Sequence, residues 1–495
     1  MNLSNIDKGA HKSSYFSDNA DARQKRKAGG FMKLELEAIH LPACGLDVHK
    51  DVIEACVFDE DGNGILKTFS TVRSALFGLR DWIVSQKCLH VLMESTSVFW
   101  IPIYEILESV NGMDVGVGNA RHMKNMPGRA KTDKSDAGWV AKLSAMGLIR
   151  KSFVVGRKFR ELREYTRHHK KLVEERARHI NRIEKLLQMN GFKLSSVLSD
   201  ITGASGLRLL GKLRDKGSVS LSDVTLALDP RCRKPPEEIE SAINGEMKLT
   251  SRVLIGLMLK KLESCNNDIA EVYNVMIKLS EPYESTLQII DSIPGIGVLS
   301  SIYILAEIGD DLSSFRTEKH FTAWAGLAPK DDESAGKLKS SKTKKANRYI
   351  KTVMVECAWA VTKTRGARVS NWYWRSVGRL GKKKAITGVA RRLFIYIYVL
   401  LKNGELYDRS LDEADTERLR AQKLESARKL VGQPESSDAE NTRKSAETIT
   451  GRKTQARPRN DSSILAGESD TPPDSPPKKR GRPRKATLEF RQNTV

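Results

Sequence analysis

The chain has 495 residues, and 84 Lys plus Arg against 61 Asp plus Glu give it a formal net charge of +23. The length predicts several domains. The positive excess favours a polyanionic partner such as nucleic acid, with a solvated basic surface and basic tail as the alternative. The scattered cysteines, 6 in all, disfavour a zinc site or a disulfide framework. No apolar run reaches membrane-spanning or signal-peptide character, so we expect a soluble cytoplasmic protein without a membrane partner.

Composition and apolar periodicity divide the chain into successive segments. The first is a polar leader, which is expected to be disordered. An α/β domain follows, then a helical or coiled-coil arm, then a mostly α-helical domain, and finally a charged, largely disordered tail. The expected boundaries are 1–38, 39–156, 157–284, 285–410 and 411–495.

Within the α/β domain, short apolar strands come first and then alternate with helices, which predicts a sheet covered by helices. The turn Asp61-Gly-Asn-Gly is of hairpin type. The expected strands are 44–48, 52–58, 65–70, 89–93 and 114–117, and the expected helices are 74–86, 99–110 and 134–146.

The arm begins with a heptad-like seam over 159–187, diluted by polar residues. It predicts a long helical hairpin or a coiled coil. Two polar seam residues, His169 and Arg176, are interpreted as register or partner-facing positions and not as ligands. The seam consists of Leu162, Thr166, His169, Val173, Arg176, Ile180, Ile183 and Leu187.

The segment 289–305 carries Ile293-Pro-Gly-Ile-Gly-Val between apolar helical stretches, the pattern of a helix–hairpin–helix. In that motif, Gly295 and Gly297 would let backbone N–H groups reach a phosphate. An ordinary tight helical turn is the alternative. A basic loop follows over 326–348, and further helices are predicted over 349–363 and 385–402.

Acidic residues in the α/β domain suggest a metal site. Asp47 lies within an apolar strand and Glu94 ends another, where a carboxylate is costly unless paired. Asp133 and Asp136 lie on one face at the start of a helix. Such a set suits a two-ion Mg²⁺ site for phosphodiester chemistry, with Mn²⁺ as an alternative ion. Asp133 as a simple helix cap and Glu94 paired with a basic residue are the competing interpretations.

Several local strings resemble the DEDD-type transposases of the insertion-sequence one-ten family, over roughly residues 43–408. The order of the blocks is more specific than any one of them. The strings are Gly45-Leu-Asp-Val-His-Lys, Met93-Glu-Ser-Thr, Asn119-Ala-Arg-His, Pro127-Gly-Arg-Ala-Lys-Thr-Asp-Lys-Ser-Asp-Ala, Asn181-Arg-Ile, Ile293-Pro-Gly-Ile-Gly-Val, Trp324-Ala-Gly-Leu-Ala-Pro and Lys344-Lys-Ala-Asn-Arg-Tyr.

The resemblance implies a Holliday-junction-resolvase type of ribonuclease-H-like domain, with Asp47, Glu94, Asp133 and Asp136 as the metal-binding catalytic acids. It also implies a C-terminal transposase domain with a nucleophilic serine. Ser334 occupies the matching position, although Glu333 and Ala335 depart from the family pattern and Ser340 and Ser341 are nearby rivals. The expected nucleic-acid contacts in these blocks are Arg129, Lys131, Lys330, Lys337, Lys339, Lys342 and Arg348.

The family resemblance further implies partners. They are double-stranded element and target DNA, a structured guide RNA, and other copies of the chain in a dimer or tetramer. Base pairing by the RNA would supply sequence choice while the protein contacts backbones. A nucleoid-associated location in the cytoplasm follows.

The tail contains Arg480-Gly481-Arg482-Pro483, which is typical of an AT-hook. An extended Arg-Gly-Arg fits the narrow minor groove of A·T tracts. A generic basic tail is the alternative.

The resemblance therefore implies an RNA-guided transposase or recombinase that exchanges DNA strands by transesterification. A resolvase-like metal-dependent nuclease without a covalent intermediate and a non-catalytic DNA-binding protein are the competing hypotheses.

Overall fold

The structure is a computed structural model that describes residues 32–33, 38–126, 133–329, 333–334, 337–338, 340 and 342–431. Of the expected leader, only residues 32–33 and 38 are described, and Met32–Lys33 form a strand of the sheet where disorder was predicted. The AT-hook-like Arg480, Gly481, Arg482 and Pro483 lie outside the described residues. Chain contacts separate 1–420 from 421–495, and the architecture below concerns the first unit. Within the described ranges, no helix combines the length and apolarity needed to cross a membrane.

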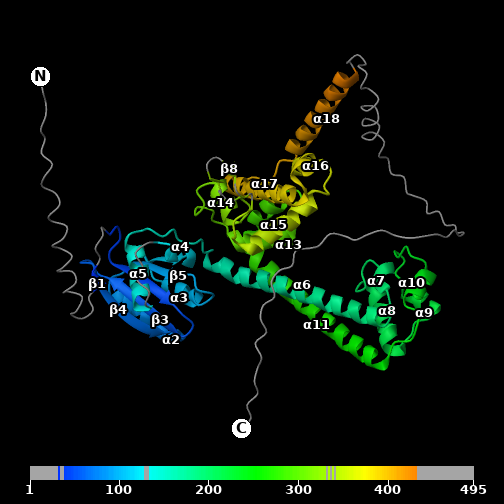
Figure 1. Ribbon diagram of the computed structural model, residues 1–495, viewed down its shortest axis with the longest axis horizontal. Coiled ribbons are helices and arrows are strands. Elements are labelled where there is room, and N and C mark those ends of the chain that lie inside the picture. The colour runs from blue at the N-terminus through cyan, green and yellow to red at the C-terminus, as the bar shows by residue number, and fades with distance from the viewer. Residues whose placement is uncertain are drawn as a thin grey trace, which may run out of the picture. The chain divides into compact units, whose positions relative to one another are not determined.

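A mixed sheet of 6 strands forms the N-terminal layer, in the order β1-β4-β3-β2-β5-β6 (Figure 1). The strands β4, β3 and β2 pair antiparallel, whereas β5 and β6 extend the sheet in parallel from β2. The parallel strands require crossover connections, which the helices supply. The strands are β1 (Met32–Lys33), β2 (Ala43–Val48), β3 (Val52–Phe58), β4 (Asn63–Ser70), β5 (His90–Glu94) and β6 (Asp114–Gly118).

Helices cover both faces of this sheet, which confirms the expected α/β class. Alternate residues of β2 serve opposite faces, as the pleat requires. Cys44, Leu46 and Val48 are buried in the core beneath α2 (Arg73–Ser85) and α3 (Trp100–Leu107). The other face carries α5 (Asp133–Ala145), whose Ala137 and Ala141 pack on Cys56 and Phe58. A short helix, α4 (Ala120–Lys124), precedes α5.

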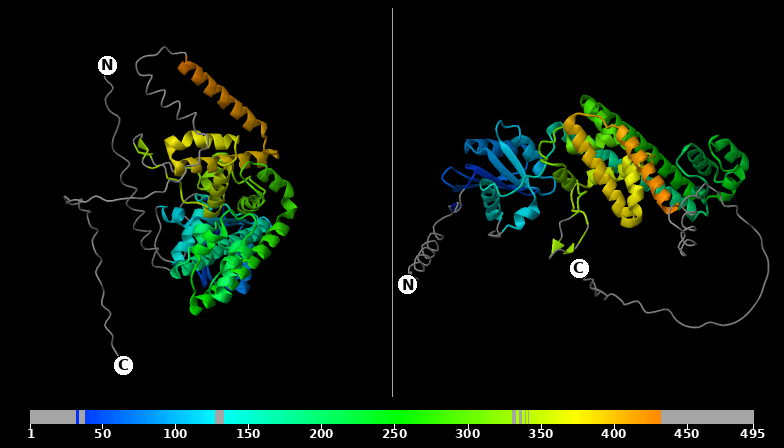
Figure 2. Two further views of the ribbon diagram at one scale, coloured as in Figure 1. Left: turned by 90° about the vertical axis from the view of Figure 1, so that its right-hand side faces the viewer. Right: turned by 90° about the horizontal axis from the view of Figure 1, so that it is seen from above.

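The predicted helical arm is a hairpin of α6 (Arg157–Met189) and α11 (Leu249–Ser280), which lie side by side in Figures 1 and 2. His169 is buried and its Nδ1 lies 2.7 Å from the Tyr303 hydroxyl, while Arg176 Nε donates to Asn266 Oδ1 of α11 at 2.8 Å. One seam position is wrong: Val173 is 44% exposed and Leu172 is buried instead. The step after His169 is three residues because 3.6 residues per turn drift from a strict heptad.

The far end of the hairpin carries a small separate core beneath short helices. Leu209, Leu210 and Leu213 of one helix face Ile239 and Ile255 in this core. The helices are α7 (Leu194–Val197), α8 (Ala204–Lys216), α9 (Leu221–Ala227) and α10 (Pro236–Ala242).

The remaining helices surround an apolar core in which Phe321 stacks on Phe394, with ring centroids 3.9 Å apart. The helical character predicted for this segment is confirmed. Sequence periodicity missed two helices of this segment, the short α14 and also α16, whose apolar face is interrupted by Trp, Tyr, Arg and Ser. The elements are η1 (Glu281–Tyr283), α12 (Glu284–Asp291), α13 (Val298–Ile308), α14 (Glu318–Trp324), α15 (Arg348–Val361), α16 (Arg368–Leu380), α17 (Lys382–Asn403) and α18 (Ser410–Val431).

Candidate functional site

The sheet places two of the predicted acids at the same strand edge. In the parallel pairing of β2 and β5, Leu46 is the register partner of Met93. Asp47 and Glu94 are the next residues along each strand, so their backbones come side by side. Because Leu92 packs against Val140 of α5, the alternating pleat directs Glu94 toward the α5 face as well. Asp47 is buried, with 7% of its surface exposed.

Gly45 brings α5 close to Asp47. A Cβ at this glycine would lie 2.0 Å from Ala141 N and 2.5 Å from Ala137 O. Only a residue without a side chain lets the helix backbone cross β2 at this distance. Since Gly45 and Asp47 share a strand face, the crossing places the first turn of α5, with Asp136, over the strand edge that carries Asp47.

The electrostatics of Asp47 reflect this crowding. Burial is the main reason that its pKa is raised from 3.8, and the nearby charges of Glu94 and Asp136 raise the pKa further. His49 acts in the opposite direction, with its Nε2 atom 3.2 Å from Asp47 Oδ2. Glu94 Oε1 accepts a hydrogen bond from the Thr96 hydroxyl at 3.4 Å. The structure therefore brings Asp47, Glu94 and Asp136 within electrostatic reach of one another.

The fourth acid, Asp133, is the first residue of α5, one helical turn before Asp136. Its side chain is outside the described residues, as are Arg129 and Lys131. Among the side chains that are described, no three His, Cys, Asp or Glu residues are arranged to hold a metal ion. The crowding of carboxylates, which a divalent cation would relieve, fits a metal site, but the described side chains alone do not complete one.

The predicted serine lies in a small hairpin. Ser334 of β7 (Glu333–Ser334) is the register partner of Lys337 of β8 (Lys337–Leu338), and a bridge between Pro329 and Thr343 closes the base of the loop. Lys342 is exposed, and its backbone N–H donates to the hydroxyl of the rival Ser340 at 3.2 Å. The side chains of Ser334 and Lys337, and all of Lys330, Lys339 and Ser341, lie outside the described residues.

A buried ionic network fastens the C-terminal end of this loop. Asn347 caps α15 by accepting from Tyr349 N at 3.0 Å, and its Nδ2 donates to Glu307 Oε2 at 2.6 Å. Glu307, which is 2% exposed, also accepts two hydrogen bonds from Arg167 of α6, at 2.8 and 3.0 Å. Arg163 Nε lies 3.4 Å from Glu307 Oε2, and burial lowers the pKa of Arg163 to about 10.

The glycine turn joins α12 to α13. Gly295 has φ +85°, and a Cβ there would lie 2.5 Å from Val361 Cβ. The close packing against α15 is therefore by itself a sufficient reason for glycine at this position. Gly297 precedes α13, whose start has no side-chain cap, and Val298 is 53% exposed. The N–H groups of this helix start therefore face no capping side chain, as an anion site requires.

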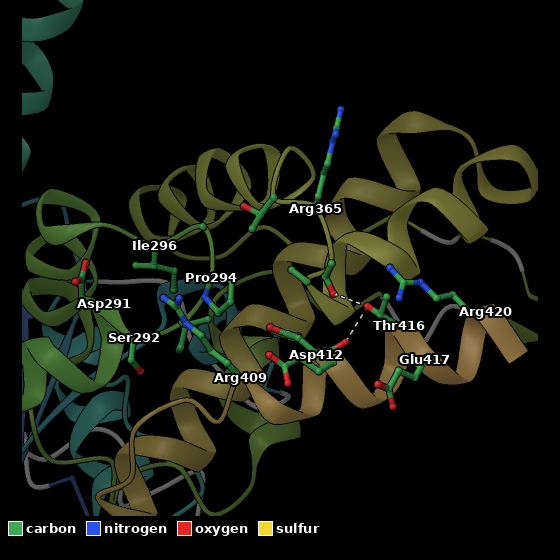
Figure 3. A pocket seen from close by; sticks show the side chains of 16 residues that line it. Asp291, Ser292, Pro294, Ile296, Arg365, Arg409, Asp412, Thr416, Glu417 and Arg420 are labelled. Carbon is green, nitrogen blue, oxygen red and sulfur yellow. Dashed lines mark hydrogen bonds between the residues drawn. The ribbon is translucent and has the colours of Figure 1, made fainter. Parts of the chain in front are cut away.

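The same turn lines a cavity of about 590 Å³ together with the Gly366 turn and the first turns of α18 (Figure 3). Thr416 of α18 donates to Gly366 O at 3.1 Å, one of the bonds drawn in the figure. Arg365, Arg409 and Arg420 line the cavity, but so do acidic residues of α18. The charge at this cavity is mixed.

Sequence reasoning missed several residues near these features. His49 follows Asp47 by two residues, so strand alternation could have placed both on one face. Glu307 gave no signal, because an acid at the end of an apolar helix is ordinary in sequence. The α16 helix was missed although Val369, Tyr373 and Ser376 recur at helical spacing and are buried.

Comparison with known proteins finds similarity to transposases in two segments of the chain. Residues 44–190 match a family model described as a transposase, and residues 287–373 match that of the transposase IS116/IS110/IS902 family. The chain is 24% identical over 371 residues to the transposase for insertion sequence element IS1111A of Coxiella burnetii, which covers 73% of this chain and 90% of that relative.

Shorter matches point the same way. The insertion element IS110 43.6 kDa protein of Streptomyces coelicolor is 28% identical over 123 residues, 24% of this chain and 30% of the relative. The insertion element IS900 42 kDa protein of Mycobacterium paratuberculosis is 23% identical over 225 residues, 45% of this chain and 53% of the relative. The two matched segments contain the acidic strand edge, the glycine turn and the loop that carries Ser334, and through them the chain is similar to transposases of the IS116/IS110/IS902 family.

Proposed function

We propose that this protein is the transposase of an insertion sequence, which cleaves DNA strands and joins them to new partners by transesterification. The observation that carries the proposal is the convergence of Asp47, Glu94 and Asp136 in a chain that is similar to transposases. The α/β domain would have the resolvase type of ribonuclease-H-like fold. Its mixed sheet, with antiparallel strands followed by parallel ones, supports that class.

The acidic residues would hold divalent cations, Mg²⁺ or alternatively Mn²⁺, with Asp133 completing the set. When bound, such ions supply Lewis-acid stabilisation of charge on the reacting phosphate. The chain itself contributes the arrangement of the ligands. The register of β2 and β5 places Asp47 and Glu94 together, the Gly45 crossing brings Asp136 over them, and His49 orients the Asp47 carboxylate through its 3.2 Å contact.

Ser334 would be the nucleophile. Its Oγ atom would form an ester bond to a backbone phosphorus while the bond to one strand oxygen breaks, which releases a strand-end hydroxyl. Lys337, the register partner of Ser334, and the exposed Lys342 are suited to hold the phosphate. The network of Glu307 and Asn347 would keep the loop end in place.

The glycine turn and the basic residues would hold nucleic-acid backbones. The uncapped start of α13 supports a phosphate contact near Gly297. Arg348, exposed at the start of α15, and the unseen Arg129, Lys131, Lys330 and Lys339 would add backbone contacts. A structured guide RNA would select element and target DNA, and the hairpin of α6 and α11 would serve assembly into a dimer or tetramer.

The decisive experiment incubates the full chain with element-end DNA, RNA transcribed from the element's non-coding flank, and Mg²⁺. We expect a covalent protein–DNA adduct on denaturing gels that disappears in Ser334→Ala and in Asp47→Ala, while Ser340→Ala retains it. Cleavage that leaves only free ends would instead support the resolvase-like nuclease. Unchanged cleavage in Asp47→Ala would contradict the metal assignment.

A further inference from the structure

A second cationic site lies away from the acids and the serine loop. A cavity of about 150 Å³ opens between α16, α17 and α18. Its lining includes Arg368 and Arg375 of α16, Arg392 of α17, and Asp415 and Arg418 of α18. Four guanidinium groups and a single carboxylate thus share one small space. This imbalance is unusual, because a cluster of like charges destabilises the folded chain unless an anion joins it.

The carboxylate in the cavity is already paired with one of the four arginines. Asp415, 4% exposed, accepts from Arg418 Nη2 at 2.6 Å and from Asn371 Nδ2 at 3.3 Å. Among the residues that the structure describes, no carboxylate forms an ion pair with the side chains of Arg368, Arg375 or Arg392. Burial lowers the pKa of Arg392, the Tyr396 hydroxyl raises it, and the charges of Arg391, Arg368 and Arg375 lower it further. The arginines therefore repel one another without a full counter-charge.

The cavity is also held rigid. The Arg392 guanidinium lies over the Trp372 ring, 3.9 Å from its centroid. The ring in turn lies on α17 at Gly388, where a Cβ would come within 2.6 Å of Trp372 Cη2. Gly388 thus makes room for Trp372, and Trp372 fixes Arg392. A side chain held in this way loses little entropy when it binds a ligand.

We propose that this cavity binds a backbone phosphate of nucleic acid, and that Asp415 is the internal competitor which the phosphate displaces. Guanidinium groups present paired N–H donors that match phosphate oxygens. The choice of nucleic acid as the source of the phosphate rests on the proposed function. Asp415 belongs to the N-terminal part of α18. This part of α18 would therefore lower the affinity of the cavity for its ligand.

The test measures the affinity of the full chain for a short DNA duplex and for an RNA duplex of the same sequence, by fluorescence anisotropy over a range of salt. The main variant is Arg375→Gln, because Arg375 is exposed and its loss leaves the core intact. Arg392→Gln is the second variant. We expect each to weaken binding roughly tenfold, as the loss of a charged hydrogen bond predicts. The slope of log affinity against log salt concentration should also become shallower by about one, which corresponds to one released counterion.

The matched control is Arg231→Gln, which removes the same charge from an exposed arginine that already pairs with Asp229 at 2.9 Å. It should bind like the unmodified chain. Asp415→Asn should act in the opposite direction and strengthen binding, since it removes the competing carboxylate. The arm that responds, DNA or RNA, identifies the source of the phosphate.

Equal affinities for Arg375→Gln, Arg392→Gln and Arg231→Gln on both duplexes would overturn the proposal, as would weaker binding by Asp415→Asn. The proposed function is tested separately by the adduct assay. It fails if Asp47→Ala and Ser334→Ala form the covalent adduct as the unmodified chain does. A chain that binds through the cavity yet forms no adduct would therefore retain this site and lose the transposase chemistry.

Discussion

Single residues decide whether the acids of this protein meet. Asp47 and Glu94 are adjacent because of strand register, whereas Asp136 reaches them from a helix that crosses β2 at Gly45. The absence of one side chain is thus as important to the site as the carboxylates. A glycine within a strand is otherwise unfavourable, and close backbone approach is one of the few reasons to keep it.

Gly45→Ala should therefore damage both stability and catalysis. The added methyl group would meet Ala141 N, and overpacking of this kind costs about 1–3 kcal/mol. Urea unfolding should show this loss, and metal-dependent strand cleavage should fall even where the variant is fully folded. The control is Gly78→Ala in α2, where a Cβ meets nothing within 4 Å and stability should hold or rise. Equal behaviour of the two variants would refute the role of the crossing.

At the scale of elements, one buried acid ties three helices together. Glu307 of α13 binds Arg163 and Arg167 of α6 and the cap residue Asn347 of α15. A buried charge of this kind is stable only while its partners are present. The network joins the hairpin of α6 and α11 to the C-terminal end of the loop that carries Ser334. Loss of Glu307 should therefore destabilise both.

Glu307→Ala should lower the free energy of unfolding by about 3 kcal/mol, because it leaves arginines without their counter-charge. The comparison is Glu175→Ala, which breaks an exposed pair with Arg178 on the same helix and should cost less than about 1 kcal/mol. Chemical denaturation measures both. A loss no larger in Glu307→Ala than in Glu175→Ala would show that the network contributes little.

His169 should make the contact between α6 and α13 sensitive to acid. Burial lowers its pKa from 6.5, so the folded protein disfavours the charged imidazolium. As the pH falls through 6.5, the unfolded chain takes up a proton before the folded one does, and stability is lost down to the folded pKa.

Melting temperatures between pH 7.5 and pH 5.5 should therefore drop less in His169→Asn than in the unmodified chain, by roughly a few degrees per kcal/mol of lost linkage. The neighbouring His168 is exposed, and His168→Asn should leave the pH profile unchanged. Identical profiles for all three proteins would exclude His169 as the source of the acid sensitivity.

The whole molecule combines a strongly basic chain with an acidic site. A net charge of +23 predicts affinity for nucleic acid that falls steeply with salt. The arginine cavity at α16 and the tail would add contacts to nucleic acid. These contacts would increase affinity, but the acidic site does not need them for strand cleavage. Binding and chemistry should therefore be separable by mutation.

The tail provides such a separation. Replacing Arg480 and Arg482 with Gln should weaken binding to an A·T-rich duplex on the order of tenfold and change binding to a G·C-rich duplex little, as loss of minor-groove recognition predicts. The control replaces Arg452 and Lys453 with Gln, an equal loss of charge in the same tail. Competition assays with both duplexes decide between a hook and a general basic tail, and equal losses for the two variants would favour the latter.

Much of this architecture could be predicted from the sequence, because the local spacing of apolar residues predicts strands and helices. The strands of the sheet, the seam of α6 and the helices around the glycine turn were of this kind. The prediction failed at Val173, which is exposed while Leu172 is buried. A heptad pattern predicts which face of a helix is apolar, but not which of two adjacent residues reaches the core. The helix α16 was missed for a related reason, since its buried face is largely aromatic and polar.

The sequence by itself determined the family resemblance, the order of the elements and the acids that could bind metal, since these depend on residue type and local spacing. Only the tertiary structure decided which of them meet. Strand register sets Asp47 beside Glu94, the helix crossing at Gly45 adds Asp136, and the packing of α16 on α17 gathers arginines far apart in the chain. Such contacts depend on how separate elements pack, and local periodicity carries no information about that.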